Sequence, residues 1–274
     1  MKVTILRAGY CTCPEHLAIQ GGRWRGIHFP AMFALLEHER SGPMLFDTGY
    51  SQRFFEETRA LPNRVYRWMT PVTLREADLA VSQLAARGIR PKDITRIFIS
   101  HFHADHISAL GDFPHASFVY LPSAFERLRG RTGLRAMAHA FMPGLLPPDF
   151  EARSQLVDIS QPCSLPPEHA PFRRGYDLLG DETLLAVELP GHAWGQMGLL
   201  ARDEQRPYFF VADAAWLMRS IAANRPPHAL ANLLFSDPSE YRGTLTGLHD
   251  YHRAHPGIAM IPSHCEDTLD EYAE

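Results

Sequence analysis

Four side chains of the kinds that bind metal ions lie within six consecutive residues: His101, His103, Asp105 and His106. His101 and His103 are two positions apart, so on an extended segment both imidazoles point to the same side and face one ion. Asp105 and His106 follow where a helix would begin, and their different directions indicate a second ion. A histidine-rich loop without metal is the alternative, but burying these groups together without a cation leaves costly unsatisfied polar atoms.

Three more residues of this kind lie downstream, each after an apolar stretch that predicts a strand. His192 follows a Pro-Gly turn, Asp213 ends one apolar run, and His264 follows another. Any one of them alone would be more typical of a cap or a surface position. Ligand sites in α/β folds form at strand ends, so their shared placement predicts that all three meet the first four at one sheet edge. Imidazole and carboxylate ligands suit zinc, manganese or iron.

The elements that must position these residues follow from hydrophobic periodicity. The pattern predicts strands at residues 3–8, 32–37, 44–47, 94–100, 117–121, 184–188, 196–200, 208–211 and 258–261, and helices at 74–86, 122–129 and 241–254. Residues 130–175 are apolar but interrupted by prolines, which predicts one or two short helices and a loop inserted between core elements. Alternating helices, strands and hairpins favour a layered α/β fold with mixed sheets.

With these residues in place, the chain resembles the metallo-β-lactamase-fold hydrolases along nearly its whole length. The HxHxDH stretch at residues 101–106, followed in order by His192, Asp213 and His264, is the specific part of this resemblance. A Phe-Asp-Thr-Gly strand end at residues 46–49 adds to it. The resemblance implies an α/β, four-layer αββα sandwich in a single domain over residues 1–274, with a helical insertion at about residues 130–175 and metals at one edge.

The same resemblance implies how the ligands divide between two divalent metal ions. The two groups are His101, His103 and His192 for one ion, and Asp105, His106 and His264 for the other. Asp213 would bridge the ions, and Asp47 would orient ligands without touching an ion. Zinc is the expected metal, with manganese or iron as alternatives.

Within this family, the chain is most similar to the N-acyl-homoserine lactonase group. His103 stands where flavodiiron oxidoreductases carry Glu, which favours hydrolysis over oxygen reduction. Residues 8–10, 29–32 and 46–49 match the lactonases, as does a late helix near Asp237 and Tyr241. Two features depart from them: Trp216 replaces a tyrosine that follows the bridging Asp, and the apolar insertion is longer. In having an aromatic residue at position 216, the chain also resembles the organophosphate-hydrolysing relatives.

The resulting hypothesis is a hydrolase that opens a lactone or cleaves a related ester with a hydroxide generated between two ions. Asp105 would be catalytic, taking the proton of that water and passing it to the leaving group. A phosphotriester or aryl-ester hydrolase, a glyoxalase II-like thioesterase and a mononuclear iron sulfur dioxygenase remain alternatives. The arginines at 127, 129, 131 and 135 are the only hint of the anion site that the thioesterase needs.

A small substrate with an apolar part is expected, because the insertion carries adaptable and flat apolar side chains. Phe141, Met142 and Trp216 are the predicted pocket residues. The alternative for Phe141 and Met142 is a hydrophobic segment simply packed on the core.

Composition limits the remaining choices. The 274 residues have a formal net charge of −4, which disfavours a nucleic-acid partner. No window approaches the roughly 18 apolar residues of a membrane span, and the N-terminus lacks a signal-peptide pattern. We therefore expect a cytoplasmic protein without a membrane partner, and leave open whether it forms a homodimer. Four cysteines in a chain of this length do not predict a disulfide framework.

Overall fold

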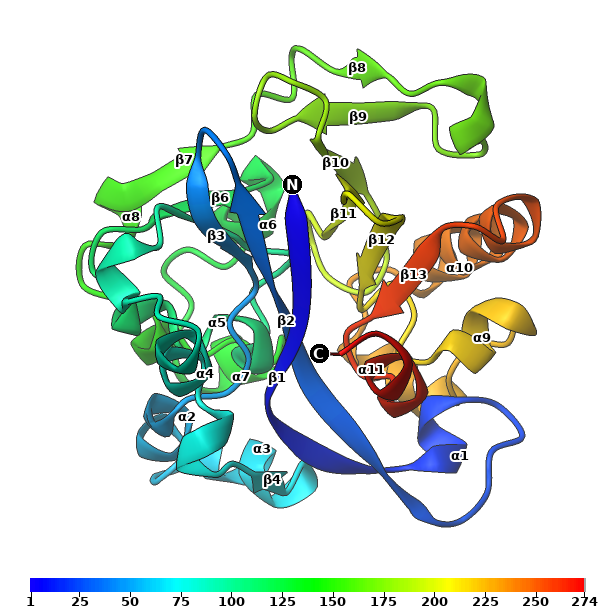
Figure 1. Ribbon diagram of the computed structural model, residues 1–274. Helices are drawn as coiled ribbons and strands as arrows, with labels where there is room; N and C mark the ends of the chain where they lie inside the picture. Colours follow the sequence, from blue (N-terminus) through cyan, green and yellow to red (C-terminus); the bar gives the residue numbers. More distant parts are fainter. Residues whose placement is uncertain (274) are drawn as a thin grey trace.

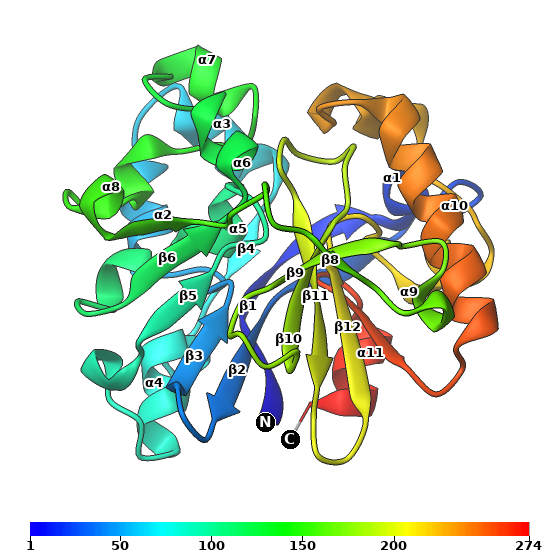
Figure 2. The ribbon, with the colours of Figure 1, turned by 90° about the horizontal axis from the view of Figure 1, so that it is seen from above.

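Two β-sheets pack face to face in the middle of the molecule, and helices cover their outer faces (Figure 1; Figure 2). The computed structural model describes residues 1–273, apart from the side chain of Glu168. Within these residues the first sheet has the strand order β4-β1-β2-β3-β5-β6-β7 and the second has the order β13-β12-β11-β10-β9-β8. Both sheets are mixed, because β3, β5, β6 and β7 pair in parallel and so do β12 and β13, whereas the other neighbours are antiparallel.

The strands of the first sheet are β1 Lys2–Pro14, β2 Gly26–His38, β3 Gly42–Phe46, β4 Val72–Thr73, β5 Arg96–Phe98, β6 Ser117–Tyr120 and β7 Ser154–Leu156. Those of the second sheet are β8 Cys163–Ser164, β9 Arg174–Asp177, β10 Leu184–Glu188, β11 Met197–Arg202, β12 Pro207–Ala212 and β13 Ala259–Pro262. The helices are α1 Glu15–Ala18, α2 Gln52–Glu57, α3 Asn63–Met69, α4 Ala80–Ala86, α5 Ala104–Ile107, α6 Pro122–Glu126, α7 Gly133–Met137, α8 Phe150–Arg153, α9 Met218–Ala222, α10 Pro238–Ala254 and α11 Glu266–Tyr272.

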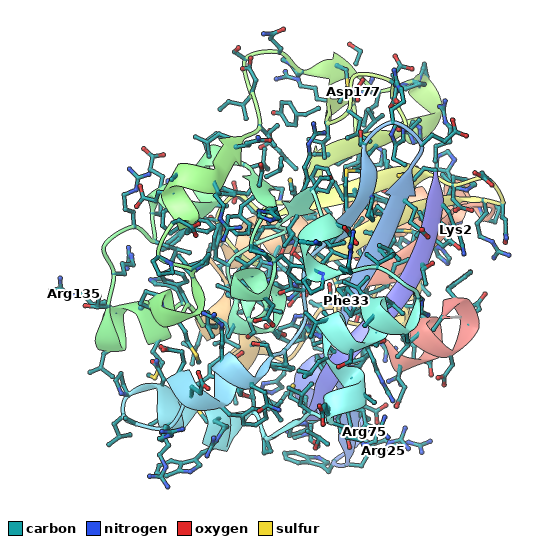
Figure 3. All side chains as sticks on the ribbon, turned by 60° about the vertical axis from the view of Figure 1, so that its left-hand side comes forward. Lys2, Arg25, Phe33, Arg75, Arg135 and Asp177 are labelled. Carbon is teal, nitrogen blue, oxygen red and sulfur yellow. The ribbon has the colours of Figure 1, made fainter. Side chains whose placement is uncertain are left out.

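Strand β2 shows why the sheets are covered on both faces. Phe33 and Leu35 pack under the helices of the first sheet, whereas Ala34 and Leu36 pack against the second sheet. Successive residues of a strand point to opposite faces, so a continuous apolar run is stable only where both faces are buried. Figure 3 shows Phe33 in the interior of the molecule. The predicted four-layer αββα arrangement is therefore confirmed.

The strands are longer than predicted at the N-terminus. The pattern predicts a strand over residues 3–8, but β1 continues to Pro14. Gly9 adopts a φ of 76°, and the pairing with β2 shifts register between Arg7 and Tyr10. This irregularity lets the strand continue and pair with β4. A Cβ at Gly9 would lie 2.7 Å from the carbonyl oxygen of Thr73, so only glycine fits there.

The helix boundaries differ from the prediction where side chains cap the backbone. The helix predicted at 74–86 is regular only over α4, because the Asp78 carboxylate accepts a hydrogen bond from the Arg75 amide at 3.1 Å and closes a separate turn. The late helix starts earlier than predicted, at Pro238, because Asp237 accepts from the amides of Ser239 and Glu240 at 2.8 and 3.0 Å.

The segment 130–175 contains the predicted short helices, α7 and α8, and also short strands that the pattern did not predict. β7 extends the first sheet, while β8 and the start of β9 extend the second. Strands of two to four residues carry too little alternation to be recognised from sequence. Among the described residues no helix has the length and hydropathy to cross a bilayer, and the four cysteines are free thiols.

Glu15, the first residue of α1, joins the end of β1 to α9, which is distant in sequence. Its buried carboxylate accepts hydrogen bonds from Arg219 at 2.7 Å, from the Arg23 amide at 3.1 Å and from Arg25 at 3.3 Å. The Arg219 guanidinium and these other donors outweigh the effect of burial and lower the pKa of Glu15 to about 2. Because the folded pKa lies below the ordinary value of 4.5, this contribution to stability is present above 4.5 and disappears as the pH falls towards 2.

We expect Glu15→Gln to lower the free energy of unfolding by about 2 kcal/mol at neutral pH, since hydrogen bonds to a charged group are lost. The difference between parent and variant should shrink as the pH falls from 4.5 towards 2, where the parent carboxyl also becomes neutral. Urea denaturation over this pH range measures it. Glu151→Gln, which breaks an exposed pair with Arg129, is the control and should change stability little. An equal and pH-independent loss in both variants would contradict the assignment.

Candidate metal centre

The seven residues predicted as ligands come from four separate strand ends and meet at one edge of the sandwich. β5 leads into His101 and His103, and α5 carries Asp105 and His106. The other three follow β10, β12 and β13: His192, Asp213 and His264. The structure places their ligand atoms in two groups, each within 4.8 Å: His101, His103, His192 and Asp213, and Asp105, His106 and His264. These are the two groups that the sequence resemblance implies, with Asp213 in the first.

In the first group the ligand atoms converge as around one ion. His192 Nε2 lies 3.0 Å from His103 Nδ1 and 3.3 Å from Asp213 Oδ2. Ligands at the vertices of a tetrahedron with bonds of about 2.1 Å are about 3.4 Å apart, so these separations are close to those around a bound ion. His101 Nε2 completes the set and makes no hydrogen bond within the described part of the chain.

Asp213 also contacts the second group. Its Oδ2 lies 3.1 Å from His264 Nε2, and its Oδ1 lies 3.4 Å from His106 Nε2. Asp105 Oδ2 lies 3.5 Å from the same His264 nitrogen. One carboxylate therefore stands between the two groups, which is the position that the bridging role requires.

Two hydrogen bonds fix which nitrogen of each second-group imidazole faces the site. His106 Nδ1 lies 2.7 Å from Asp47 Oδ2, and His264 Nδ1 lies 2.9 Å from the carbonyl oxygen of Pro30. Each Nδ1 donates its proton outward, so each Nε2 is the nitrogen that faces the centre. The Phe29 ring stacks on the His264 ring with their centroids 5.1 Å apart. Phe29 and Pro30, from the segment 29–32 that matches the lactonases, therefore both contact this imidazole.

Asp47 is itself held by Ser100, the residue just before the histidine stretch. The Ser100 amide donates to Asp47 Oδ1 at 2.8 Å, and the Ser100 hydroxyl donates to Oδ2 at 2.7 Å. Asp47 has a φ of 59° and Ala212, before Asp213, has a φ of 48°. Non-glycine residues rarely adopt this left-handed conformation, and strain of this kind is concentrated at functional sites. The sequence resemblance implies that Asp47 orients ligands, but it implies no role for Ser100.

The electrostatics of the site separate the imidazoles into two kinds. Burial lowers the pKa of His101 and His192, and lowers that of His103 to about 4, so these rings are neutral. Burial also opposes charge on His106 and His264, but the surrounding carboxylates outweigh it and raise the pKa of both. The same imidazoles overcome burial at Asp213 and hold its pKa well below the usual range.

The donor set fits divalent metal ions. His101 Nε2, His106 Nε2 and Asp213 Oδ1 are buried without a hydrogen-bond partner among the described residues. Each such atom costs about 1–3 kcal/mol when left unsatisfied, and here the three belong to side chains gathered at one point. Imidazole nitrogens and carboxylate oxygens suit zinc, and also manganese or iron.

A mostly apolar cavity of about 300 Å³ opens onto this centre. Its floor contains His103, Asp105, His192, Asp213 and His264. Its walls come from β1, β2, α3, α7 and the segments after β3, β12 and α9: Cys11, Cys13, Phe29, Tyr50, Val65, Tyr66, Met69, Thr70, Met137, Ala138, Ala140, Trp216 and Leu234. The volume and lining suit a small molecule with an apolar part.

Trp216 lines the cavity as predicted and also contacts the centre. Its indole N–H donates to Asp213 Oδ2 at 3.1 Å. The ring packs edge-on against Phe29 and Phe235, with centroids 5.8 Å away in each case. Trp216 therefore helps to orient the carboxylate that stands between the two groups.

The prediction for Phe141 and Met142 is wrong. Both are buried in the core under the first sheet, and neither lines the cavity. Phe141 packs near Phe102 and Phe125. Ala140, with a φ of 49°, reverses the chain after α7, so the preceding residues face the cavity and the next two face the core. The insertion does form a wall, but through Met137, Ala138 and Ala140.

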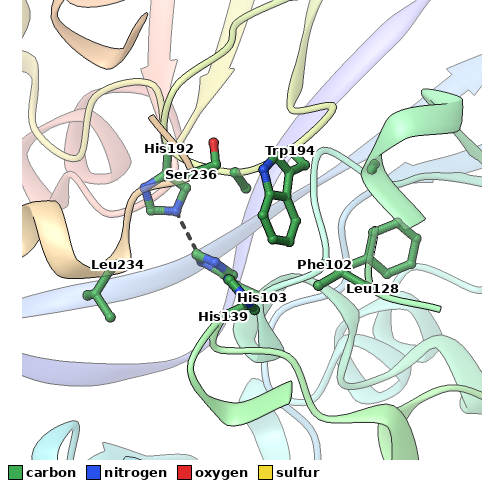
Figure 4. Close-up of a pocket in the computed structure, with 10 residues that line it drawn as sticks. Phe102, His103, Leu128, His139, His192, Trp194, Leu234 and Ser236 are labelled. Atoms are coloured by element: carbon green, nitrogen blue, oxygen red, sulfur yellow. Dashed lines mark hydrogen bonds between the residues drawn. The ribbon is translucent and has the colours of Figure 1, made fainter. Parts of the chain in front are cut away.

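A second, small cavity lies on the other side of His103 and His192 (Figure 4). Figure 4 shows these imidazoles facing each other, with Trp194 beside them and Leu234 on the opposite side. The guanidinium groups of Arg127 and Arg131 lie 5.5 and 5.2 Å from the Trp194 ring. Sequence reasoning missed Trp194, because a single aromatic residue in a loop gives no periodic signal, although it follows His192 by two positions.

Residues 29–254 match the sequence model of the metallo-beta-lactamase superfamily. The N-acyl homoserine lactonase AttM of Azorhizobium caulinodans is 28% identical over 229 residues, which cover 80% of this chain and 78% of that protein. The probable metallo-hydrolase Rv2300c of Mycobacterium tuberculosis is 25% identical over 255 residues, which cover 85% of this chain and 74% of that protein.

Among solved structures, an N-acyl homoserine lactone hydrolase with N-hexanoyl-L-homoserine bound at its catalytic metal center is similar in fold. It has a TM-score of 0.72 at 19% identity, covering 98% of this chain and 95% of that one. The curated relatives are named lactonases and metallo-hydrolases, which supports a metal-dependent hydrolase acting on ester bonds. Because the family match spans most of the chain, this protein belongs to the metallo-beta-lactamase superfamily.

Proposed function

We propose that this protein is a dinuclear metal-dependent hydrolase that opens a lactone or cleaves a related ester of a small substrate with an apolar part. The observation that carries the proposal is the position of Asp213, whose two oxygens lie within 3.4 Å of imidazoles in both ligand groups, on the floor of the cavity. The curated lactonase relatives support the same class of ester.

Two divalent ions, when bound, supply a hydroxide near neutral pH and polarise the scissile carbonyl. His101, His103 and His192 would hold one ion, and Asp105, His106 and His264 the other, with Asp213 between them. The chain's own contribution is to keep these lone pairs aimed inward through Asp47 and Pro30.

Asp105 is the residue placed to move the proton. Its carboxylate lies on the cavity floor, 3.5 Å from His264 Nε2 and 3.9 Å from His106 Nε2. It would take the proton of the attacking water and return it to the leaving oxygen, which completes hydrolysis without a change in net charge. The apolar walls keep bulk water from this transfer.

Two alternatives have a specific observation in their favour. Trp216 on the cavity wall suits an aryl ester or a phosphotriester, because a flat ring can lie against it. Arg127 and Arg131 beside Trp194 would suit the anionic part of a glutathione-like thioester. The mononuclear iron sulfur dioxygenase is disfavoured, because that enzyme class would leave a second complete group of ligand side chains without a role.

A hydrolysis panel tests the proposed class. The zinc- or manganese-loaded protein is assayed on N-acyl-homoserine lactones, simple lactones, aryl esters, phosphotriesters and thioesters. We expect lactones or aryl esters with an apolar chain to have the highest kcat/KM. Elemental analysis should find two metal ions per chain in the active protein. One iron per chain, together with oxygen consumption, would contradict the proposal.

Asp213→Ala should abolish binding of two metal ions, because it removes the carboxylate common to both groups. We expect fewer than two tightly bound ions per chain and a fall in kcat/KM of more than about a hundredfold. Mass spectrometry of the metal content and steady-state kinetics measure both. Asp149→Ala, an exposed carboxylate paired with Arg153, is the matched control. Retention of two tight ions and full activity in Asp213→Ala would refute the site assignment.

Met137→Asn should raise KM for long-chain substrates by about tenfold, because a polar amide replaces an apolar part of the cavity wall. Substrates with short chains should be affected less, and kcat little. Kinetics on a series of chain lengths measure this difference. Ile159→Asn, an exposed residue that does not line this cavity, is the control. Equal effects on short and long chains would show that Met137 does not contact the chain.

A further inference from the structure

Large apolar side chains are exposed around the mouth of the cavity. Met69 and Leu234 line the cavity and are also 74% and 46% exposed, so they mark its mouth. Four more apolar residues of the same segments are exposed: Trp68, Leu134, Leu230 and Leu233, the last by 81%. Single exposed apolar residues are ordinary, but a group around one opening is typical of an interaction surface.

These residues come from three segments that are distant in sequence. Trp68 and Met69 end α3, Leu134 lies on α7, and the leucines belong to the 3-10 helix η6, Ala229–Leu234. Figure 2 shows α3 and α7 on one side of the upper edge and the segment that precedes α10 on the other. All three segments line the same cavity. We call the exposed residues of these three segments, together with the arginines of residues 58–75 and 127–148, the mouth face.

The mouth face is also strongly basic. Residues 58–75 and 127–148, which contain α3 and α7, together carry eight arginines and no aspartate or glutamate, although the whole chain has a net charge of −4. The eight are Arg59, Arg64, Arg67, Arg75, Arg127, Arg129, Arg131 and Arg135. The remainder of the chain is therefore strongly acidic. This asymmetry indicates a partner that carries negative charge.

Most of these arginines are available to such a partner. Arg75 and Arg129 are paired with carboxylates. In the part of the chain that the structure describes, no ion pair is found for Arg59, Arg64, Arg67, Arg127, Arg131 or Arg135. Figure 3 shows Arg135 at the outer margin of the molecule. Arg64 lies 5.2 Å from the ring of the exposed Trp68, so charge and apolar surface are interleaved.

We propose that the mouth face docks on an anionic lipid surface, with the cavity opening towards the bilayer. Exposed Trp and Leu side chains insert at the level of the headgroups, and the arginines bind lipid phosphates. An amphiphilic substrate would then enter from the lipid phase. This goes beyond the proposed hydrolysis, and it replaces the expectation of no membrane partner, which rested only on the absence of an apolar span.

A second copy of this chain or a polynucleotide fits the mouth face less well. An isologous dimer through this face would bring two sets of unpaired arginines together. A polynucleotide would engage the arginines, but it would leave exposed leucine and methionine side chains without a complementary apolar surface. An anionic bilayer complements both the charge and the apolar side chains.

Vesicle sedimentation without substrate tests the docking, so its outcome is independent of the hydrolase assignment. The full-length protein is mixed with vesicles of phosphatidylcholine alone or of an equimolar mixture with phosphatidylglycerol. We expect binding to the anionic vesicles only, weakened by salt and accompanied by a blue shift of tryptophan fluorescence. Arg64→Ser and Arg135→Ser should each weaken binding by roughly fivefold, and Leu233→Ser by roughly tenfold.

Exposed residues outside the mouth face provide the controls. Arg87→Ser and Leu156→Ser should bind as the parent does. Absence of binding to anionic vesicles would overturn the proposal, and so would equal binding to both vesicle types. If the protein self-associates, does not bind vesicles, and loses its self-association in Leu233→Ser, then the mouth face binds a second copy of the chain. Binding to an oligonucleotide but not to vesicles would assign it to a polyanion.

Discussion

A single buried carboxylate determines much of this structure. Asp213 has imidazoles from three different segments within 3.4 Å, those of His106, His192 and His264. A buried charge of this kind is stable only if it is paired, so the ends of β5, β10, β12 and β13 have to meet at one edge of the sandwich. The two-sheet core provides the rigid frame that holds those ends in place.

The groups behind the centre decide what it presents to a ligand. Asp47 and the Pro30 carbonyl each accept the outward proton of one imidazole, and Ser100 holds Asp47 in turn. Asp47 and Ala212, the residue before Asp213, both adopt the left-handed backbone conformation at this edge. The lone pairs are thus arranged by packing and hydrogen bonding of the chain itself, which is the preorganisation that metal-assisted hydrolysis requires.

The surface around the centre has a different character from the rest of the molecule. The cavity walls are apolar, its mouth is ringed by exposed Trp, Met and Leu side chains, and the neighbouring segments carry arginines without acidic residues. The segments around the mouth, α3, α7 and η6, are short helices outside the two sheets and are not strands of the sandwich. The proposed chemistry and the proposed docking therefore rest on separate parts of the fold.

The sequence by itself determined most of the longer strands, the layered α/β class and the candidate ligand residues, because apolar periodicity and the spacing of His101, His103, Asp105 and His106 are local signals. Only the tertiary structure decided which side chains face the cavity. A left-handed turn at Ala140 sends Phe141 into the core and leaves Met137 on the wall, and no periodic pattern reveals such a turn. Contacts between residues distant in sequence depend on how strands and loops assemble, and the sequence pattern does not contain that information.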